Sequence, residues 1–173
     1  GTFIVGELSR ELVVTVQYSS MCPCSAALSR QIIQSQFDTD FAGQTSVSAS
    51  DVRTWLGTEE GIAATPHSQR SEVHILTRLE AGTTQFPISD LIDQVEDTLQ
   101  TAVQTAVKRE DEQEFARRNA ANLMFCEDAG RRVKKSLNED ARFSDFCVRV
   151  EHMESLHPLD AVSIFTKGVA GGY

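Results

Sequence analysis

The side chains best suited to metal binding or proton transfer gather in four short stretches, two of which carry soft ligands. Cys22 and Cys24 are separated only by Pro23, which fixes one backbone angle and holds the two thiols in a definite relative orientation. His67 lies in a proline-bearing turn, the kind of segment in which functional groups are commonly displayed. Taken singly, a Cys-x-Cys pair favours a structural role. Together, thiolate and imidazole are ligands that zinc accepts.

The other two stretches supply carboxylates and a second histidine. Glu112 lies in an acidic run, where a solvated charged surface is the more typical role, and Glu154 precedes His157 by three residues in a turn. Carboxylate ligands extend the tolerance of a mixed site from zinc to manganese or iron. A catalytic site of this kind keeps one position open for water, whose pKa the metal lowers to about 7.

Glu127 differs from the other acidic residues because it interrupts an apolar stretch at the start of a predicted helix. A carboxylate there either caps backbone amides or is held for a ligand. The remaining candidates favour packing. Cys126 and Cys147 lie in apolar surroundings and are expected to be small buried residues, while His74 and His152 are interpreted as packing or surface histidines.

The elements that must position these residues follow from hydrophobic periodicity. Alternating or β-branched runs predict strands at Glu7–Tyr18, Ser71–Glu80, Phe143–Met153 and Ala161–Thr166. Helical spacing predicts helices at Ala26–Gln36, from Ser89 to about Ala106, and from about Asn122 to Leu137, with residues 108–112 between the last two. Residues 30–64 are interpreted as an inserted loop or helical excursion within a single domain of residues 1–173.

The order strand, strand, helix, helix, strand, strand predicts an α+β fold, with an antiparallel sheet and both helices on one face. Such a sheet has free edges, so we expect a homo-oligomer. The net charge of −9 argues against nucleic-acid binding, and no apolar run is long enough to cross a membrane. Without a visible signal peptide or a disulfide framework, the expected location is cytoplasmic.

Five motifs in sequence order resemble the type IB GTP cyclohydrolases, the metal-promiscuous form of the first enzyme of folate and pterin synthesis. They are CPCS (22–25), HSQRS (67–71), KREDE (108–112), NLMFCED (122–128) and ESLHP (154–158). The resemblance implies the tunnelling fold, assembled into homotetramers or other homo-oligomers with active sites between subunits. It also implies conversion of GTP and water to 7,8-dihydroneopterin triphosphate and formate, with manganese, iron or zinc as cofactor.

The resemblance also implies roles for individual residues. It implies four metal ligands, which are Cys22, His67, Glu112 and Glu154. It implies four residues that take part in catalysis, which are Cys22, Cys24, His67 and His157. The glutamate that anchors the purine falls on Glu127.

This sequence departs from the family pattern in three ways. Family members often have lysine where this chain has Ala26, their cysteine and histidine motifs are usually closer together, and their chains usually carry a further N-terminal portion. Two other functions stay open. One is the tunnelling-fold nitrile reductase of queuosine synthesis, which uses a cysteine nucleophile and a nicotinamide cofactor. The other is a non-catalytic binding module with a structural metal.

Overall fold

The computed structural model describes residues 2–4 and 7–173 and contains a four-stranded antiparallel sheet in the order β3-β4-β5-β6. The strands of this sheet are β3 (Glu11–Met21), β4 (Ser68–Leu79), β5 (Phe143–His152) and β6 (Ala161–Thr166). The helices are α1 (Pro23–Asp40), α2 (Ala49–Trp55), α3 (Ile88–Leu99), α4 (Arg109–Ala121) and α5 (Cys126–Asn138). A short antiparallel pair, β1 (Thr2–Ile4) and β2 (Glu7–Ser9), precedes the sheet.

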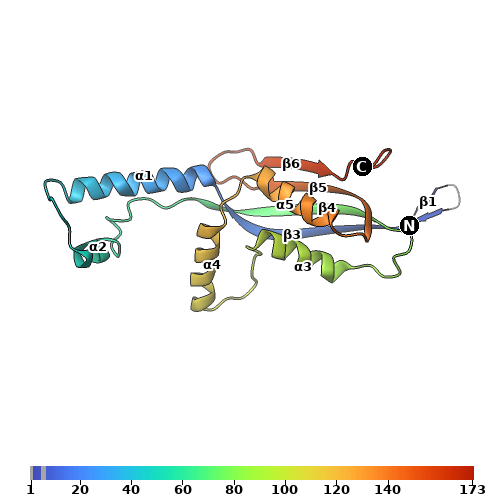
Figure 1. Cartoon of the computed structure of the whole chain (residues 1–173), viewed down its shortest axis with the longest axis horizontal. Coiled ribbons are helices and arrows are strands. Elements are labelled where there is room, and N and C mark those ends of the chain that lie inside the picture. Colours follow the sequence, from blue (N-terminus) through green and yellow to red (C-terminus); the bar gives the residue numbers. More distant parts are fainter. Residues whose placement is uncertain (1, 5–6) are drawn as a thin grey trace.

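One face of the sheet carries the core, because apolar residues occupy alternate positions of the strands. In β3 the side chains of Leu12, Val14 and Val16 are buried, whereas Val13 between them is 69% exposed. Helices α3 and α5 cover the buried face and also pack against each other (Figure 1). In α5 the buried positions include Ala129 and Val133, which recur at helical spacing. The expected α+β class, with helices packed on one face of an antiparallel sheet, is therefore confirmed, and the tunnelling fold stays a prediction.

Helices α1 and α2 project from one end of the sheet (Figure 1). The predicted helix Ala26–Gln36 lies within the longer α1, which begins at Pro23, a residue whose fixed φ suits the first helical position. Phe37, Phe41 and Trp55 join the two helices in an aromatic cluster, and the indole of Trp55 donates a 2.8 Å hydrogen bond to Asp40. Residues 30–64 thus contain most of a helical projection with a small apolar contact of its own.

The prediction that the helix starting at Ser89 continues to about Ala106 is wrong. Helix α3 ends at Leu99, and Gln100 adopts a left-handed conformation with φ of 69°. The next residues lie along β3, where the Ser19 N–H donates to the Thr101 carbonyl at 2.8 Å and the Val103 N–H donates to the Gln17 carbonyl at 3.2 Å. Hydrogen bonding to the strand edge replaces the helical bonds that the periodicity of the segment would allow.

The interpretation of residues 108–112 as a segment between helices is also wrong, because α4 begins at Arg109. Asp111 accepts a 2.8 Å hydrogen bond from the Lys108 N–H and so caps the first turn. Glu114 binds the guanidinium groups of Arg117 and Arg118 one turn later, which supports the exposed helix. Phe115 is the only large apolar residue of the helix, so an apolar periodicity could not reveal it.

The strand predictions need small changes or none. The expected run Glu7–Tyr18 is divided at Arg10 into β2 and β3, and β3 continues to Met21. The prediction for Ala161–Thr166 is confirmed at both ends by β6.

We predict that Gly130→Ala destabilises the fold, although a helix interior is normally about 1 kcal/mol more stable with alanine than with glycine. A Cβ on Gly130 in α5 would lie 2.2 Å and 2.5 Å from ring atoms of Phe165 in β6. Overpacking of this kind costs about 1–3 kcal/mol. Urea denaturation measures the free energy of unfolding. Gly82→Ala is the control, since no heavy atom lies within 4 Å of its added Cβ. Equal stability of the two variants would contradict this packing.

Candidate active site

The register of β3 against β4 brings the Cys22 and His67 stretches together. Met21, the last residue of β3, pairs with Ser68, the first residue of β4. Cys22 therefore leaves the sheet where His67 enters it. The contact is fixed by a side chain of α1, because the Ser25 hydroxyl accepts a 3.0 Å hydrogen bond from the His67 N–H. Both Cys22 and His67 are partly exposed at this end of the sheet.

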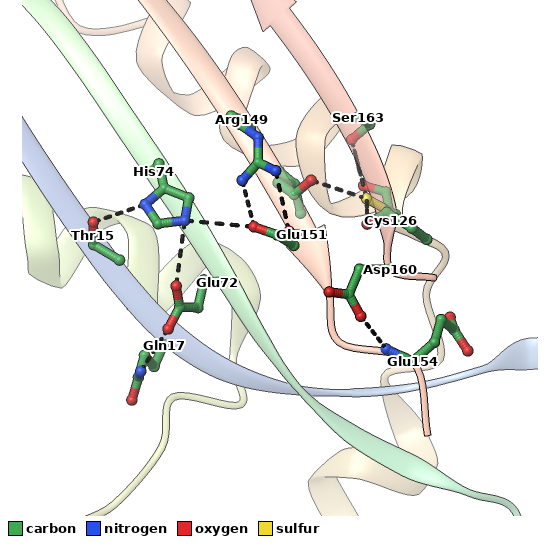
Figure 2. Close-up of polar contacts among 12 residues, drawn as sticks. Thr15, Gln17, Glu72, His74, Cys126, Arg149, Glu151, Glu154, Asp160 and Ser163 are labelled. Carbon is green, nitrogen blue, oxygen red and sulfur yellow. Dashed lines mark hydrogen bonds and ion pairs between the residues drawn. The ribbon is translucent and has the colours of Figure 1, made fainter. Parts of the chain in front are cut away.

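Glu154 reaches the same end from β5 and is held at both its backbone and its side chain. Its N–H donates a 3.0 Å hydrogen bond to Asp160, and Figure 2 shows the carboxylate pointing away from that contact. The amide nitrogen Nε2 of Gln69 donates to Oε1 of Glu154 at 3.1 Å. The next residue, Ser155, places its hydroxyl 3.4 Å from Nδ1 of His67. The ESLHP motif therefore lies against the histidine motif.

Glu112 lies in the first turn of α4, close to this end of the sheet. Its neighbour Asp111 caps the helix, so the backbone amides do not require the Glu112 carboxylate. Glu112 instead lines a cavity of about 390 Å³ together with Tyr18, Gln69 and Phe115. Ser19 of β3 also lines this cavity, and its hydroxyl donates a 2.8 Å hydrogen bond to the side-chain oxygen of Asn119 in α4.

Glu127 lies in the first turn of α5 and is exposed. Of the two roles that the sequence left open, capping belongs to the next residue, since Asp128 accepts a 3.1 Å hydrogen bond from the Phe125 N–H. Within residues 2–4 and 7–173 the Glu127 carboxylate has no hydrogen-bond or ion-pair partner. It is therefore free to bind a ligand.

Cys24 and His157 are exposed in the CPCS and ESLHP stretches. Across the part of the chain that the structure describes, no three His, Cys, Asp or Glu residues are grouped closely enough to hold a metal ion. The structure thus brings the Cys22, His67 and Glu154 stretches to one end of the sheet. The four-residue ligand set stays a prediction.

Sequence reasoning missed a buried polar cluster beside these residues. The core face of the sheet becomes polar at this end, and His152, only 3% exposed, lies at its centre. Its Nε2 is 2.8 Å from the Tyr18 hydroxyl, and its Nδ1 is 3.3 Å from the Ser20 hydroxyl, which also contacts Ser71 at 2.7 Å. The change along β3 from Val14 and Val16 to tyrosine and serine at the same alternate positions was the available signal.

Burial lowers the pKa of His152 to about 4, although the nearby carboxylates of Glu154 and Glu127 act in the opposite direction. Burial also raises the pKa of Tyr18 and of the Cys126 thiol above their ordinary values. The cluster is therefore neutral at pH 7.

A second polar network lies on the opposite, open face of the sheet (Figure 2). The ring of His74 contacts the Thr15 hydroxyl at 3.0 Å and the Glu72 carboxylate at 3.3 Å. Glu151 lies 3.9 Å from the same ring and pairs with Arg149. These contacts join the polar rows of three strands, and they confirm the interpretation of His74 as a surface histidine.

A family model described as type I GTP cyclohydrolase folE2 matches residues 3–163. The chain belongs to the type I GTP cyclohydrolase folE2 family. This match confirms the resemblance carried by the five motifs.

Individual relatives agree with the family match. GTP cyclohydrolase FolE2 of Pseudoalteromonas translucida is 54% identical over 168 residues, covering 97% of this chain and 55% of that protein. The FolE2 protein of Hydrogenovibrio crunogenus is 54% identical over 170 residues, covering 97% of this chain and 53% of the relative. The FolE2 protein of Chromohalobacter salexigens is 57% identical over 152 residues, covering 88% of this chain and 50% of the relative. The chain spans about half the length of these folE2 relatives. None of the described helices has the length and apolar character needed to cross a membrane.

We predict that His152 makes the protein less stable in acid. Its folded-state pKa of about 4 lies below the ordinary 6.5, so the unfolded chain binds more protons between these values. The contribution of His152 to the free energy of unfolding is therefore fully present above about pH 6.5, and about 3 kcal/mol of it is lost as pH decreases from there through about 4. Urea denaturation over a pH series in metal-free buffer measures this. His152→Gln should flatten the dependence of the free energy of unfolding on pH, and the control His74→Gln should leave it unchanged. An unchanged slope in His152→Gln would contradict the assignment.

Proposed function

We propose that this chain carries the metal-dependent active-site residues of a type IB GTP cyclohydrolase, which starts folate and pterin biosynthesis. The reaction converts GTP and water to 7,8-dihydroneopterin triphosphate and formate. The observation that carries the proposal is the family match over residues 3–163. The arrangement of the Cys22, His67 and Glu154 stretches at one end of the sheet supports it.

The proposed metal ligands are Cys22, His67, Glu112 and Glu154. Their thiolate, imidazole and carboxylate groups suit manganese, iron or zinc, and three of the four stretches adjoin one another. When bound, the metal supplies activation of water at neutral pH. Of the two histidines, His157 would hold or transfer protons, since imidazole is the usual proton carrier near neutral pH, whereas His67 would do so only through the ring nitrogen that does not bind the metal. Cys24 is exposed two residues from Cys22 and is proposed to take part in the reaction.

Glu127 is the proposed purine anchor. An ionised carboxylate accepts two hydrogen bonds, here from N1–H and the 2-amino group of guanine, and such charge-assisted pairs are strong. Adenine offers no donor at N1, so the contact selects guanine. The exposure of Glu127 and the assignment of the capping role to Asp128 support this assignment.

The proposed assembly is a tunnelling-fold homotetramer or another homo-oligomer, with active sites between subunits and residues 30–64 projecting from a single domain. Two features support it. The outward-facing residue Ile164 of the edge strand β6 is 61% exposed, and a strand edge with apolar side chains pairs readily with another chain. The candidate residues also lie at an open end of the sheet, where a neighbouring subunit can reach them.

The decisive experiment incubates the protein with GTP after reconstitution with manganese, iron or zinc, and monitors formate and pterin fluorescence. We expect product with at least one metal and none after chelation. Absence of product with all three metals would refute the proposed function.

We predict that Glu127→Gln lowers GTP turnover while the protein retains its metal. A neutral amide cannot accept from both guanine donors, and losing a hydrogen bond to a charged group costs about 1.5–3 kcal/mol, or roughly tenfold to a hundredfold in rate. Turnover and bound metal per chain are measured together. Glu139→Gln, at the exposed far end of α5, is the matched control and should keep both. Equal losses of metal and turnover in Glu127→Gln would overturn the anchor assignment.

A further inference from the structure

Gln69 is a buried side chain bonded to one of the proposed metal ligands. It lies on the core side of β4, opposite Ser20 of β3, and is only 8% exposed. Its Nε2 donates to Oε1 of Glu154 at 3.1 Å. An ionised carboxylate can only accept hydrogen bonds, so the Gln69 amide must present its nitrogen to Glu154 and direct its oxygen elsewhere.

That oxygen, Oε1 of Gln69, is buried and has no hydrogen-bond partner among the residues that the structure describes. A buried acceptor without a partner costs free energy, and native proteins tolerate few of them. The side chain also lines the cavity of about 390 Å³ that contains Glu112 and Arg70. The fold thus keeps an unfavourable arrangement in the wall of a cavity shared with another proposed ligand. Departures of this kind are expected at functional sites.

We infer that Gln69 is a positioning residue, which orients the Glu154 carboxylate for the reaction without itself touching the metal. Asp160 fixes the backbone of Glu154, but only Gln69 among the described residues donates to its side chain. The carboxylate is therefore held in one orientation by a partner that is rigid because it is buried in a strand. Preorganisation of this kind accelerates a reaction without contributing to stability. The inference rests on the proposed function and deepens it.

Gln94 provides a matched control within the same chain. Its Nε2 donates to the backbone and side-chain oxygens of Ser136 at 3.1 Å and 2.9 Å, and its Oε1 is likewise buried and unpartnered within the described residues. It joins α3 to α5 rather than lining the cavity. Replacing either glutamine by methionine removes the same polar atoms at nearly the same volume.

The test compares Gln69→Met, Gln69→Glu and Gln94→Met in the complete manganese-loaded protein with GTP as substrate, measuring kcat, KM and Tm. We expect Gln69→Met to lower kcat at least about tenfold, with KM within about threefold, because it affects the transition state rather than nucleotide binding. The Tm of Gln69→Met should not fall below that of Gln94→Met. Both substitutions remove a buried oxygen without a partner, and Gln69→Met removes one donated hydrogen bond where Gln94→Met removes two. Gln69→Glu should lose more kcat, because it places two carboxylates together. Gln94→Met should keep wild-type kcat.

A kcat of Gln69→Met within about twofold of wild type would overturn the positioning role. Equal kcat losses in Gln69→Met and Gln94→Met would overturn it too. A fall in Tm that accounts for the kcat losses of both Gln69 variants would show that the role is structural. These results differ from failure of the proposed function, in which the wild-type protein itself forms no product with any metal.

Discussion

The antiparallel register of β3, β4 and β5 is the constraint on which the rest of the structure depends. Pairing of Met21 with Ser68 places Cys22 beside His67, and pairing of Ser71 with His152 leads the chain to Glu154. Because side chains alternate between faces, a slip of one residue would turn every core side chain of a strand toward solvent. Burial of the apolar residues therefore fixes the register, and the register fixes the site.

The core face of the sheet is apolar in its middle and polar at the end that carries the candidate site. In its middle it buries valine and isoleucine under α3 and α5, which favours folding through removal of apolar area from water. Toward the candidate site it buries Ser20, Gln69 and His152 instead. These polar residues contribute less to folding and one of them keeps an unpartnered oxygen. A rigid apolar sheet allows the polar end to be held in a fixed geometry at this cost.

Helices α4 and α5 each carry one of the proposed site residues at their first turn. The first turn of each helix is capped by an aspartate, Asp111 in α4 and Asp128 in α5. Beside each aspartate lies a glutamate, Glu112 or Glu127, that takes no part in capping. Glu112 therefore lines the cavity and Glu127 is exposed. The helix start supplies favourable electrostatics for an acidic residue, so extra carboxylates are tolerated at this position.

Several features followed from the sequence by itself, because they depend on local pattern. Alternation specified the strands, the helical period specified the start of α3 and the core of α5, and the five ordered motifs identified the family. Only tertiary structure decided the rest. Residues 101–103 do not continue α3, because they form hydrogen bonds with the edge of β3 instead. Helix α4 was not predicted, because its sequence has no apolar periodicity. The burial of His152 and the bond from Gln69 to Glu154 depend on which strands adjoin, and no local pattern specifies that.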